Sequence, residues 1–320
     1  MTYVALGDSY AAGVGGGERV DACFRSRAGY PVIVSEAIGK TLVYEACSGA
    51  VVDDVRRGQL ARLDAQTELV TVSVGGNDAG FAEVLTACAR PAWMGETDPV
   101  IDEAERVMRE DLPGRLGALH EDVRSRAPQA QLVATGYPRL FAGEECNLST
   151  FFSPRELTRL NAAADLLAEV MGAAARAAGA VFVDVRDEFE GHAVCQDPEW
   201  IRGASWPLDE SFHPNATGHR AIADAVLVEL GRQPVGAPAE PRPAVLASRP
   251  AIAYGRPHDH GRKMFRLPDL LSSESLAGAK DSGLDVDEVR RLAEAGGPDA
   301  EARLHQLDRQ VRATLPTVVE

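Results

Sequence analysis

Short apolar runs alternate with longer amphipathic stretches along the first 232 residues of the chain. The run from Leu69 to Val74 is continuous and rich in β-branched residues, which is typical of a strand buried on both faces of a sheet. The alternation predicts an α/β fold in which a five-stranded parallel sheet carries helices on both faces. The predicted strands are Val4–Leu6, Thr41–Tyr44, Leu69–Val74, Gln131–Thr135 and Ala180–Asp184.

Helical patterns fill the intervals between these runs. Ser153, followed by Pro154 and Glu156, is a favourable helix start, because serine caps the first turn and proline fits its first position. Pro113 lies inside another helical stretch and should break or kink it. The predicted helices cover residues 30–38, 100–127, 153–179 and 215–231.

The pattern changes after about residue 233. Prolines recur between residues 234 and 257, with alanine, arginine and glycine between them, as in an extended linker. Two helical patterns follow at residues 285–295 and 299–314, and the second places Leu304, Leu307 and Val311 at helical spacing. We therefore predict a main domain over residues 1–232, a proline-rich linker over 233–265 and a small helical extension over 266–320. The extension is expected to dock on the main domain or to mediate self-association.

Composition narrows the function class. The chain has 320 residues and a formal net charge of -15, which argues against nucleic acid as a partner because phosphate binding needs clustered Lys and Arg. No stretch is apolar for long enough to predict a transmembrane helix. The first residues lack the charged-then-apolar pattern of a secretory leader, so the sequence as written predicts a cytoplasmic protein. A mature secreted form would look the same.

The five cysteines leave two alternatives open. They are scattered without a C-x-x-C pair, so no metal site is predicted from them. Cys23 with Cys47, and Cys146 with Cys195, would form two loop-closing disulfides and leave Cys88 single. The other interpretation is five thiols in a reducing compartment.

Residues suited to acyl transfer follow three of the predicted strands. Ser9 follows the first strand, where ligands of open α/β sheets bind, and is a candidate nucleophile. Gly49 and Asn77 follow the second and third strands and are candidate donors to an oxyanion. His213 precedes the last predicted helix of the main domain and is a candidate base. Each residue alone also fits a structural role, as a helix cap, a turn residue or a core histidine.

In combination the chain resembles the SGNH hydrolases, also called GDSL lipases and esterases. The resemblance covers residues 1–232 and is carried by Gly7-Asp8-Ser9-Tyr10, Gly49, Gly75-Gly76-Asn77-Asp78 and His213-Pro214. It is closest to the actinobacterial branch, which includes secreted lipases, phospholipases and esterases. It implies a flavodoxin-like three-layer α/β/α sandwich and cleavage of carboxylic esters through a covalent acyl-Ser9 intermediate, without a metal or organic cofactor. By the resemblance, Ser9 is the nucleophile, His213 is the base, and Ser9, Gly49 and Asn77 form the oxyanion hole.

The chain departs from the family pattern at two places. The family often has an aspartate three residues before the histidine, where this chain has Glu210. Glutamate can orient an imidazole, but relatives in the actinobacterial branch use a main-chain carbonyl, which here would belong to Glu210 or Ser211; both alternatives stay open. Secreted members tend to carry three disulfides, which need six cysteines, whereas this chain has five.

The expected substrate is a small-molecule or lipid ester. Two other functions fit the same residues. The first is an acyltransferase that passes the acyl group to a hydroxyl or amine. A product that forms only when such an acceptor is present, with little free acid, would indicate this function. The second is a non-catalytic binding module on the same fold. If Ser9 failed to react with a fluorophosphonate, this function would be indicated.

Overall fold

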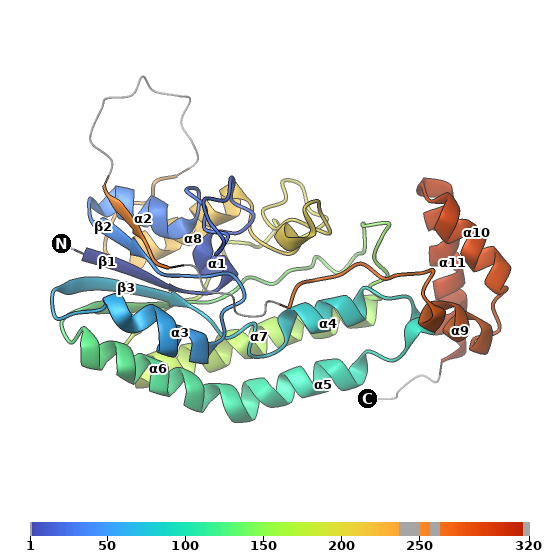
Figure 1. Cartoon of the computed structure of the whole chain (residues 1–320), viewed down its shortest axis with the longest axis horizontal. Helices are drawn as coiled ribbons and strands as arrows, with labels where there is room; N and C mark the ends of the chain where they lie inside the picture. The colour runs from blue at the N-terminus through green and yellow to red at the C-terminus, as the bar shows by residue number, and fades with distance from the viewer. Residues whose placement is uncertain (1, 237–249, 257–262, 316–320) are drawn as a thin grey trace, which may run out of the picture.

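The computed structural model describes residues 2–236, 250–256 and 263–315 (Figure 1). Within these ranges the strands form one parallel sheet in the order β5-β4-β3-β1-β2-β6. The order is that of a flavodoxin-like sheet with one strand added beyond β2. The α/β class and the five predicted strands are confirmed. The strands are β1 (Thr2–Gly7), β2 (Thr41–Tyr44), β3 (Thr67–Ser73), β4 (Gln131–Thr135), β5 (Val181–Val183) and β6 (Ile252–Tyr254).

The sixth strand corrects the predicted number of five. β6 lies in the segment predicted to be a proline-rich linker, and it pairs with β2 so that Leu42 is opposite Ile252 and Tyr44 is opposite Tyr254. Three residues are too short a pattern to predict a strand, and the pairing depends on the unpaired backbone groups that the edge of β2 offers. Residues 237–249 and 257–262 of the predicted linker lie outside the described residues.

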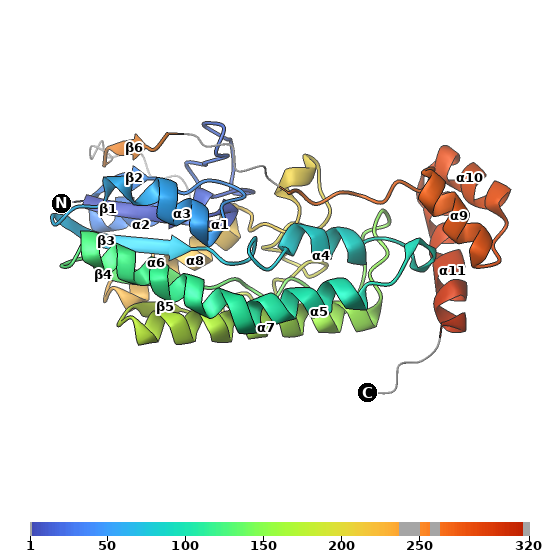
Figure 2. The ribbon, with the colours of Figure 1, turned by 60° about the horizontal axis from the view of Figure 1, so that its bottom comes forward.

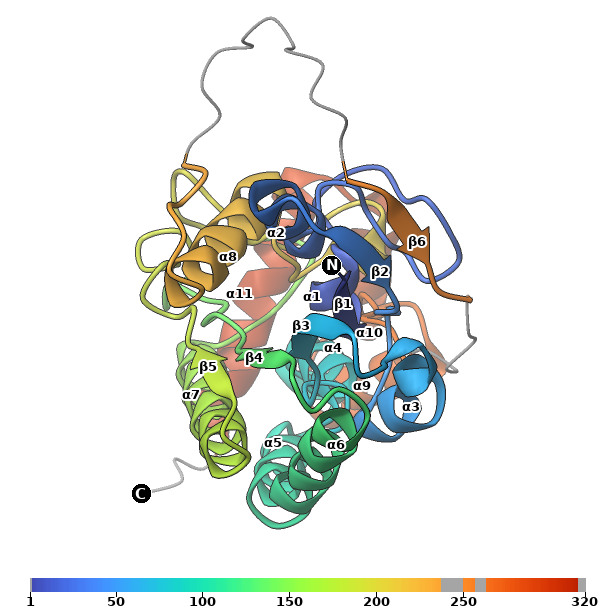
Figure 3. The same cartoon turned by 90° about the vertical axis from the view of Figure 1, so that its left-hand side faces the viewer.

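Helices cover both faces of the sheet and give the expected three layers. Several of them extend beyond the carboxyl ends of the strands, as Figure 2 shows for α4, α5 and α7. On one face lie α2 (Tyr30–Ile38) and α8 (Ala216–Glu229), and on the other lie α3 (Val52–Gly58), α6 (Leu112–Arg126) and α7 (Pro154–Ala177) (Figure 3). The shorter elements of this domain are α1 (Ser9–Ala12), η1 (Gln59–Arg62), α4 (Phe81–Cys88), η2 (Ala92–Met94), α5 (Asp98–Arg106) and η4 (Leu208–Glu210).

The helix predicted over residues 100–127 is two helices joined by a π-helical turn. α5 is followed by the π turn η3 (Val107–Asp111) and then by α6. Pro113 falls in the first turn of α6, where a residue without an N–H costs no hydrogen bond within that helix. The irregularity therefore lies one turn before the proline, where the wider π turn separates the two helices.

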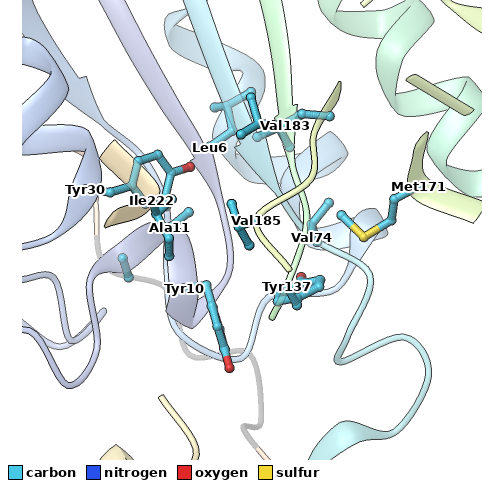
Figure 4. Packing of buried hydrophobic residues seen from close by; sticks show 14 of the residues in the cluster. Leu6, Tyr10, Ala11, Tyr30, Val74, Tyr137, Met171, Val183, Val185 and Ile222 are labelled. Atoms are coloured by element: carbon cyan, nitrogen blue, oxygen red, sulfur yellow. The ribbon is translucent and has the colours of Figure 1, made fainter. Parts of the chain in front are cut away.

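The main core lies between the sheet and the two helix layers. Four consecutive residues of β1, Tyr3–Leu6, are completely buried, as expected for a central strand covered on both faces. Figure 4 shows part of this core, with side chains contributed by strands and by α1, α2, α7 and α8. Burial of one such aliphatic side chain stabilises the fold by about 1.5–3 kcal/mol. The core therefore fixes β1 firmly, and with it the position of the serine that follows.

Two disulfides link loops around the carboxyl edge of the sheet. Cys23–Cys47 and Cys146–Cys195 are both present, which confirms the oxidised alternative. Cys47 lies two residues before Gly49, so the first bridge holds the loop that carries this glycine to the loop after α1. Cys88 is free and buried, and burial raises the pKa of its thiol to about 12, which keeps it protonated and unreactive.

Three further helices form a separate group at the end of the molecule opposite the N-terminus (Figures 1 and 2). They pack around Trp93 and Phe151 of the main domain in a second, smaller apolar core. The Trp93 indole N–H donates to Ser275 Oγ (3.1 Å), and the Ala92 N–H donates to Asp308 Oδ1 (2.6 Å). In the described part of the chain, no helix combines the length and the apolar character that a membrane span requires. The helices are α9 (Ser273–Asp281), which was not predicted, and α10 (Val286–Ala295) and α11 (Pro298–Thr314), which were.

Candidate active site

The three residues predicted at strand ends lie together at the carboxyl edge of the sheet. Ser9 follows β1, Gly49 follows β2 and Asn77 follows β3. β2 and β3 flank β1 on opposite sides, so the loops after these strands diverge and leave a crevice at this point. Together with His213 from the loop before α8, the three residues line one cavity. Among the described residues, no group of three or more His, Cys, Asp or Glu side chains is placed to hold a metal ion.

The Ser9 hydroxyl and the His213 imidazole are in hydrogen-bond contact. Ser9 Oγ lies 2.7 Å from His213 Nε2, and His213 Nδ1 lies 2.9 Å from the main-chain carbonyl of Ser211. A carbonyl oxygen only accepts, so Nδ1 carries the proton and donates it. Nε2 of the neutral ring is then free to accept from the serine hydroxyl, which is the tautomer that a general base requires.

Glu210 lies close in sequence, but its carboxylate is directed elsewhere. Its oxygens lie 3.4 Å from the Arg19 guanidinium and 3.5 Å from that of Arg202. Of the two alternatives for orienting the imidazole, the geometry therefore favours the Ser211 carbonyl over the Glu210 carboxylate. The reason is local: residues 208–210 form η4, and the chain direction after this turn brings the carbonyl of Ser211, rather than the preceding side chain, to Nδ1.

We expect Glu210→Gln to leave kcat within about threefold of the wild-type value, because only partly exposed ion pairs with arginines are lost. The measurement is steady-state hydrolysis of a p-nitrophenyl ester, with Asp209→Asn as a matched control that also loses an ion pair with Arg19. A fall of several hundredfold for Glu210→Gln alone would mean that the carboxylate orients the imidazole.

Ser9 and Gly49 line the same cavity, and each has a backbone N–H that could serve as a donor there. Gly49 has a φ of 85°, a left-handed conformation that favours glycine and that turns the loop after β2 across the strand ends. Ser9 is the first residue of α1, whose N-cap is Asp8, so its N–H belongs to the first turn and has no partner within the helix. Such preorganised N–H groups stabilise the negative charge that develops on a carbonyl oxygen during acyl transfer.

The Asn77 amide faces the same cavity and is held by the neighbouring loop. Its Nδ2 donates to the Ala50 carbonyl (3.1 Å). The next residue, Asp78, accepts from the Val52 N–H (3.0 Å), so two hydrogen bonds join the loop after β3 to the loop after β2. An amide nitrogen has two protons, and the second remains available to a ligand.

A tyrosine that sequence analysis did not assign supports the histidine loop. The Tyr10 hydroxyl donates to the Phe212 carbonyl (2.8 Å), and the Tyr10 ring lies 5.3 Å from the His213 ring. Phe212 itself has a φ of 60°, which a bulky residue adopts only under strain of about 1–3 kcal/mol. Its N–H is fixed to the Arg202 carbonyl (2.8 Å). Tyr10 directly follows the serine, but nothing in its local pattern identifies a partner 202 residues away.

Asp8 has a structural role in the turn that carries Ser9. Its Oδ1 accepts from the Tyr10 N–H (3.0 Å), and its Oδ2 accepts from the Tyr137 hydroxyl (2.6 Å). Burial raises the pKa of this carboxyl to about 7, although the two hydrogen bonds lower it in part. Asp8 therefore changes charge near neutral pH, next to the nucleophile.

His213 is kept neutral by its surroundings. Burial lowers its pKa from 6.5 to about 4, while the Ser211 carbonyl and the charge of Asp209 raise it. Because the pKa in the folded state is depressed, the neutral base is present above about pH 5 and is lost as pH falls through about 4.

We expect kcat/KM at pH 5.5 to stay within about twofold of its value at pH 7.5, whereas a base of ordinary pKa would lose about tenfold. The measurement is a pH profile of kcat/KM with circular dichroism at each pH. Asp8→Asn is the control, because it removes the other group that titrates beside Ser9. An inflection near pH 6.5 in both proteins would contradict the shift assigned to His213.

The chain is similar to one family model and to several known proteins. The model of the "GDSL-like Lipase/Acylhydrolase family" matches residues 5–221. Lipase 1 of Streptomyces coelicolor is 38% identical over 222 residues, which cover 68% of this chain and 81% of that protein. The structure of phospholipase A1 from Streptomyces albidoflavus NA297 superposes with a TM-score of 0.67 at 35% identity and covers 70% of this chain and 97% of that one. The structure of an extracellular lipase from Streptomyces rimosus superposes with a TM-score of 0.66 at 35% identity and covers 70% of this chain and 97% of that one.

Proposed function

The chain belongs to the GDSL-like lipase/acylhydrolase family and is an ester-hydrolysing enzyme, and we propose that a Ser9–His213 dyad performs its chemistry. The observation that carries the assignment is the 2.7 Å contact between Ser9 Oγ and His213 Nε2. In this proposal the Ser211 carbonyl orients the imidazole, and the N–H groups of Ser9 and Gly49 with the Asn77 amide form the oxyanion hole.

Acylation begins when Ser9 Oγ attacks the ester carbonyl carbon and His213 Nε2 takes the hydroxyl proton. The carbonyl oxygen becomes negatively charged in the tetrahedral intermediate and is stabilised by the three donors. The intermediate collapses, the bond to the alcohol oxygen breaks, and the imidazolium returns the proton to that oxygen. The alcohol leaves, and the acyl group remains as an ester of Ser9.

Deacylation repeats these steps with water. His213 removes a proton from a water molecule, whose oxygen attacks the acyl carbon, and the oxyanion hole holds the second tetrahedral intermediate. Collapse breaks the bond to Ser9 Oγ, which regains its proton from the imidazolium. The product is the free carboxylic acid. Every transferred proton is thus carried by Nε2 of His213, while the Nδ1 proton stays on the ring and is donated to the Ser211 carbonyl throughout.

We place the acyl chain of the substrate in a second cavity beside Ser9. This cavity runs from Ser9 and Asn77 between α4, α5 and α7. Its lining is mostly aliphatic, with Val84, Leu85 and Ile101 among the residues that contribute. Apolar side chains favour a hydrocarbon chain over a polar acyl group, since its transfer from water is favourable by about 0.8 kcal/mol per CH₂.

Two further proposals concern the setting of the enzyme. We propose a secreted mature enzyme, because two disulfides form and persist in oxidising compartments and the similar lipase from Streptomyces rimosus is extracellular. We also propose that the C-terminal helices dock on their own chain rather than on a second copy. The second apolar core around Trp93 supports this proposal.

Labelling with a fluorophosphonate tests the dyad directly, since the probe reacts with an activated serine through the same attack. We expect the wild-type protein to be labelled at Ser9, and Ser9→Ala to remain unlabelled. Ser48→Ala is the control, because Ser48 lines the same cavity without contacting His213 in a hydrogen bond. Labelling of Ser9→Ala at the wild-type rate would exclude Ser9 as the nucleophile.

A further inference from the structure

One wall of the catalytic cavity comes from the C-terminal part of the chain. Lys263, Met264 and Phe265, which we name the strap, line the cavity that contains Ser9 and His213. The family model ends at residue 221, so the strap is not part of the domain which that model describes. In Figure 2 the orange segment that begins with the strap runs alongside α4 to α9.

The strap is packed against both sides of the cavity. Phe265 is only 6% exposed, and its ring meets the Phe212 ring edge to face, with centroids 4.9 Å apart. Phe212 is the residue before His213, so the strap touches the loop that presents the base. On the other side, the Lys263 ammonium pairs with Glu83 of α4.

Contacts farther along the chain hold the strap in place. The Arg266 N–H donates to Thr86 Oγ1 of α4 (3.1 Å). Beyond it, α9 packs so closely on the main domain that a Cβ added to Gly278 would lie 1.9 Å from the Trp93 carbonyl oxygen. On the N-terminal side, β6 is paired into the sheet. The strap is therefore a fixed wall of the cavity.

Two cavities meet at Ser9, and the chemistry assigns a different half of the ester to each. The apolar cavity between α4, α5 and α7 does not include His213, whereas the cavity under the strap does. His213 must give its proton to the departing alcohol oxygen, so that oxygen has to lie beside the imidazole. The alcohol half of the ester therefore extends into the cavity under the strap.

We propose that the strap forms the alcohol-binding wall of the active site and sets the size of alcohol that the enzyme accepts. The inference rests on the dyad proposed above. The contacting groups are the Met264 side chain and the Phe265 ring, which offer apolar surface to the alcohol. The charged groups at this cavity are paired, Lys263 with Glu83 and Asp209 with Arg19, so the wall suits an uncharged alcohol.

Met264 provides the sharpest test, because its side chain is 43% exposed and shortening it leaves no cavity in the core. The assay measures kcat/KM, which reports acylation, on octanoate esters of alcohols from methanol to cyclohexanol. We expect Met264→Ala to raise the ratio of cyclohexyl to methyl ester about tenfold, and Met264→Trp to lower it about tenfold. Methyl esters of butanoic to dodecanoic acid should keep their wild-type ratios in both variants.

Leu267→Ala is the matched control, since Leu267 is on the same segment, is also partly exposed and does not line the cavity. Leu267→Ala should leave both the alcohol selectivity and the acyl-chain selectivity unchanged. An unchanged alcohol profile in both Met264 variants, with activity still dependent on Ser9, would overturn the inference and leave the dyad intact. A change in the acyl profile instead would assign the strap to the other half of the ester, and this too would overturn it. Loss of the dyad itself would appear separately, as activity that persists in Ser9→Ala.

Discussion

Ser9→Ala is expected to lower kcat by a factor on the order of 10⁶, leaving only the activity that binding and the oxyanion donors supply. The substitution removes the atom that forms the acyl-enzyme, and no other hydroxyl is in hydrogen-bond contact with His213 Nε2 among the described residues. Alanine is well tolerated in the first turn of a helix, so the melting temperature should stay close to that of the wild-type enzyme. The measurement is steady-state hydrolysis of a p-nitrophenyl ester.

The dyad also predicts how the rate losses of the Ser9 and His213 variants combine in a double variant. His213→Ala should cost about as much as Ser9→Ala, and the double variant should be no slower than either, because serine and histidine act as one unit. Losses that multiply in the double variant would mean that the two side chains act independently. A His213→Ala enzyme with near-normal kcat would exclude the imidazole as the base.

Asn77→Ala is expected to lower kcat by about 10²–10³ while KM changes little. The amide stabilises an oxygen that is charged only in the transition state, so its loss affects the chemical step more than substrate binding. The measurement is kcat and KM on the same p-nitrophenyl ester, with a fluorophosphonate labelling rate as an independent readout of nucleophilic attack.

The loop geometry requires a control for Asn77, because its amide also donates to the Ala50 carbonyl. Asp78→Ala provides it, because it removes the acceptor of the Val52 N–H and so loosens the same two loops while it keeps the Asn77 amide. We expect kcat of Asp78→Ala to stay within about threefold of the wild-type value, since no transition-state contact is removed. If both variants lose kcat equally, the loss comes from disturbing the loops, and Asn77 is not an oxyanion donor.

The strap indicates which residues should be varied to change the alcohol selectivity of this enzyme. The residues proposed to supply the chemistry, Ser9, Gly49, Asn77 and His213, all lie in the part of the chain that the family model covers. The wall over them comes from residues 263–265, and these are held by contacts to α4 and to the loop of Phe212. Reactivity and alcohol selectivity therefore depend on different segments of the chain. Substitutions in the strap can change the alcohol selectivity without changing the reactivity of Ser9.

The sequence alone determined the α/β class, five of the six strands and the four residues that meet in the cavity. The strands, Ser9, Gly49 and Asn77 have local signals: an apolar run marks a buried strand, and a polar or glycine residue at its carboxyl end marks a position at the sheet edge. His213 precedes a helix instead and was identified from its combination with the other three residues. The proposed pairing of cysteines also followed from the chain, although oxidation was left open until the structure showed both bridges.

Only the tertiary structure decided the contacts between segments far apart in the chain. β6 forms because its backbone pairs with the open edge of β2. The Tyr10 hydroxyl donates to the Phe212 carbonyl, which is 202 residues away in the chain. Glu210 and Ser211 are both close to His213 in the chain, but the choice between them also needed the structure, because it depends on the path of the backbone through η4. Met264 and Phe265 line the cavity because contacts with α4 and with Phe212, far away in the sequence, hold this segment over the site. Hydrophobic periodicity reports whether a residue is buried, but not which distant surface buries it, and that physical difference separates the two sets of features.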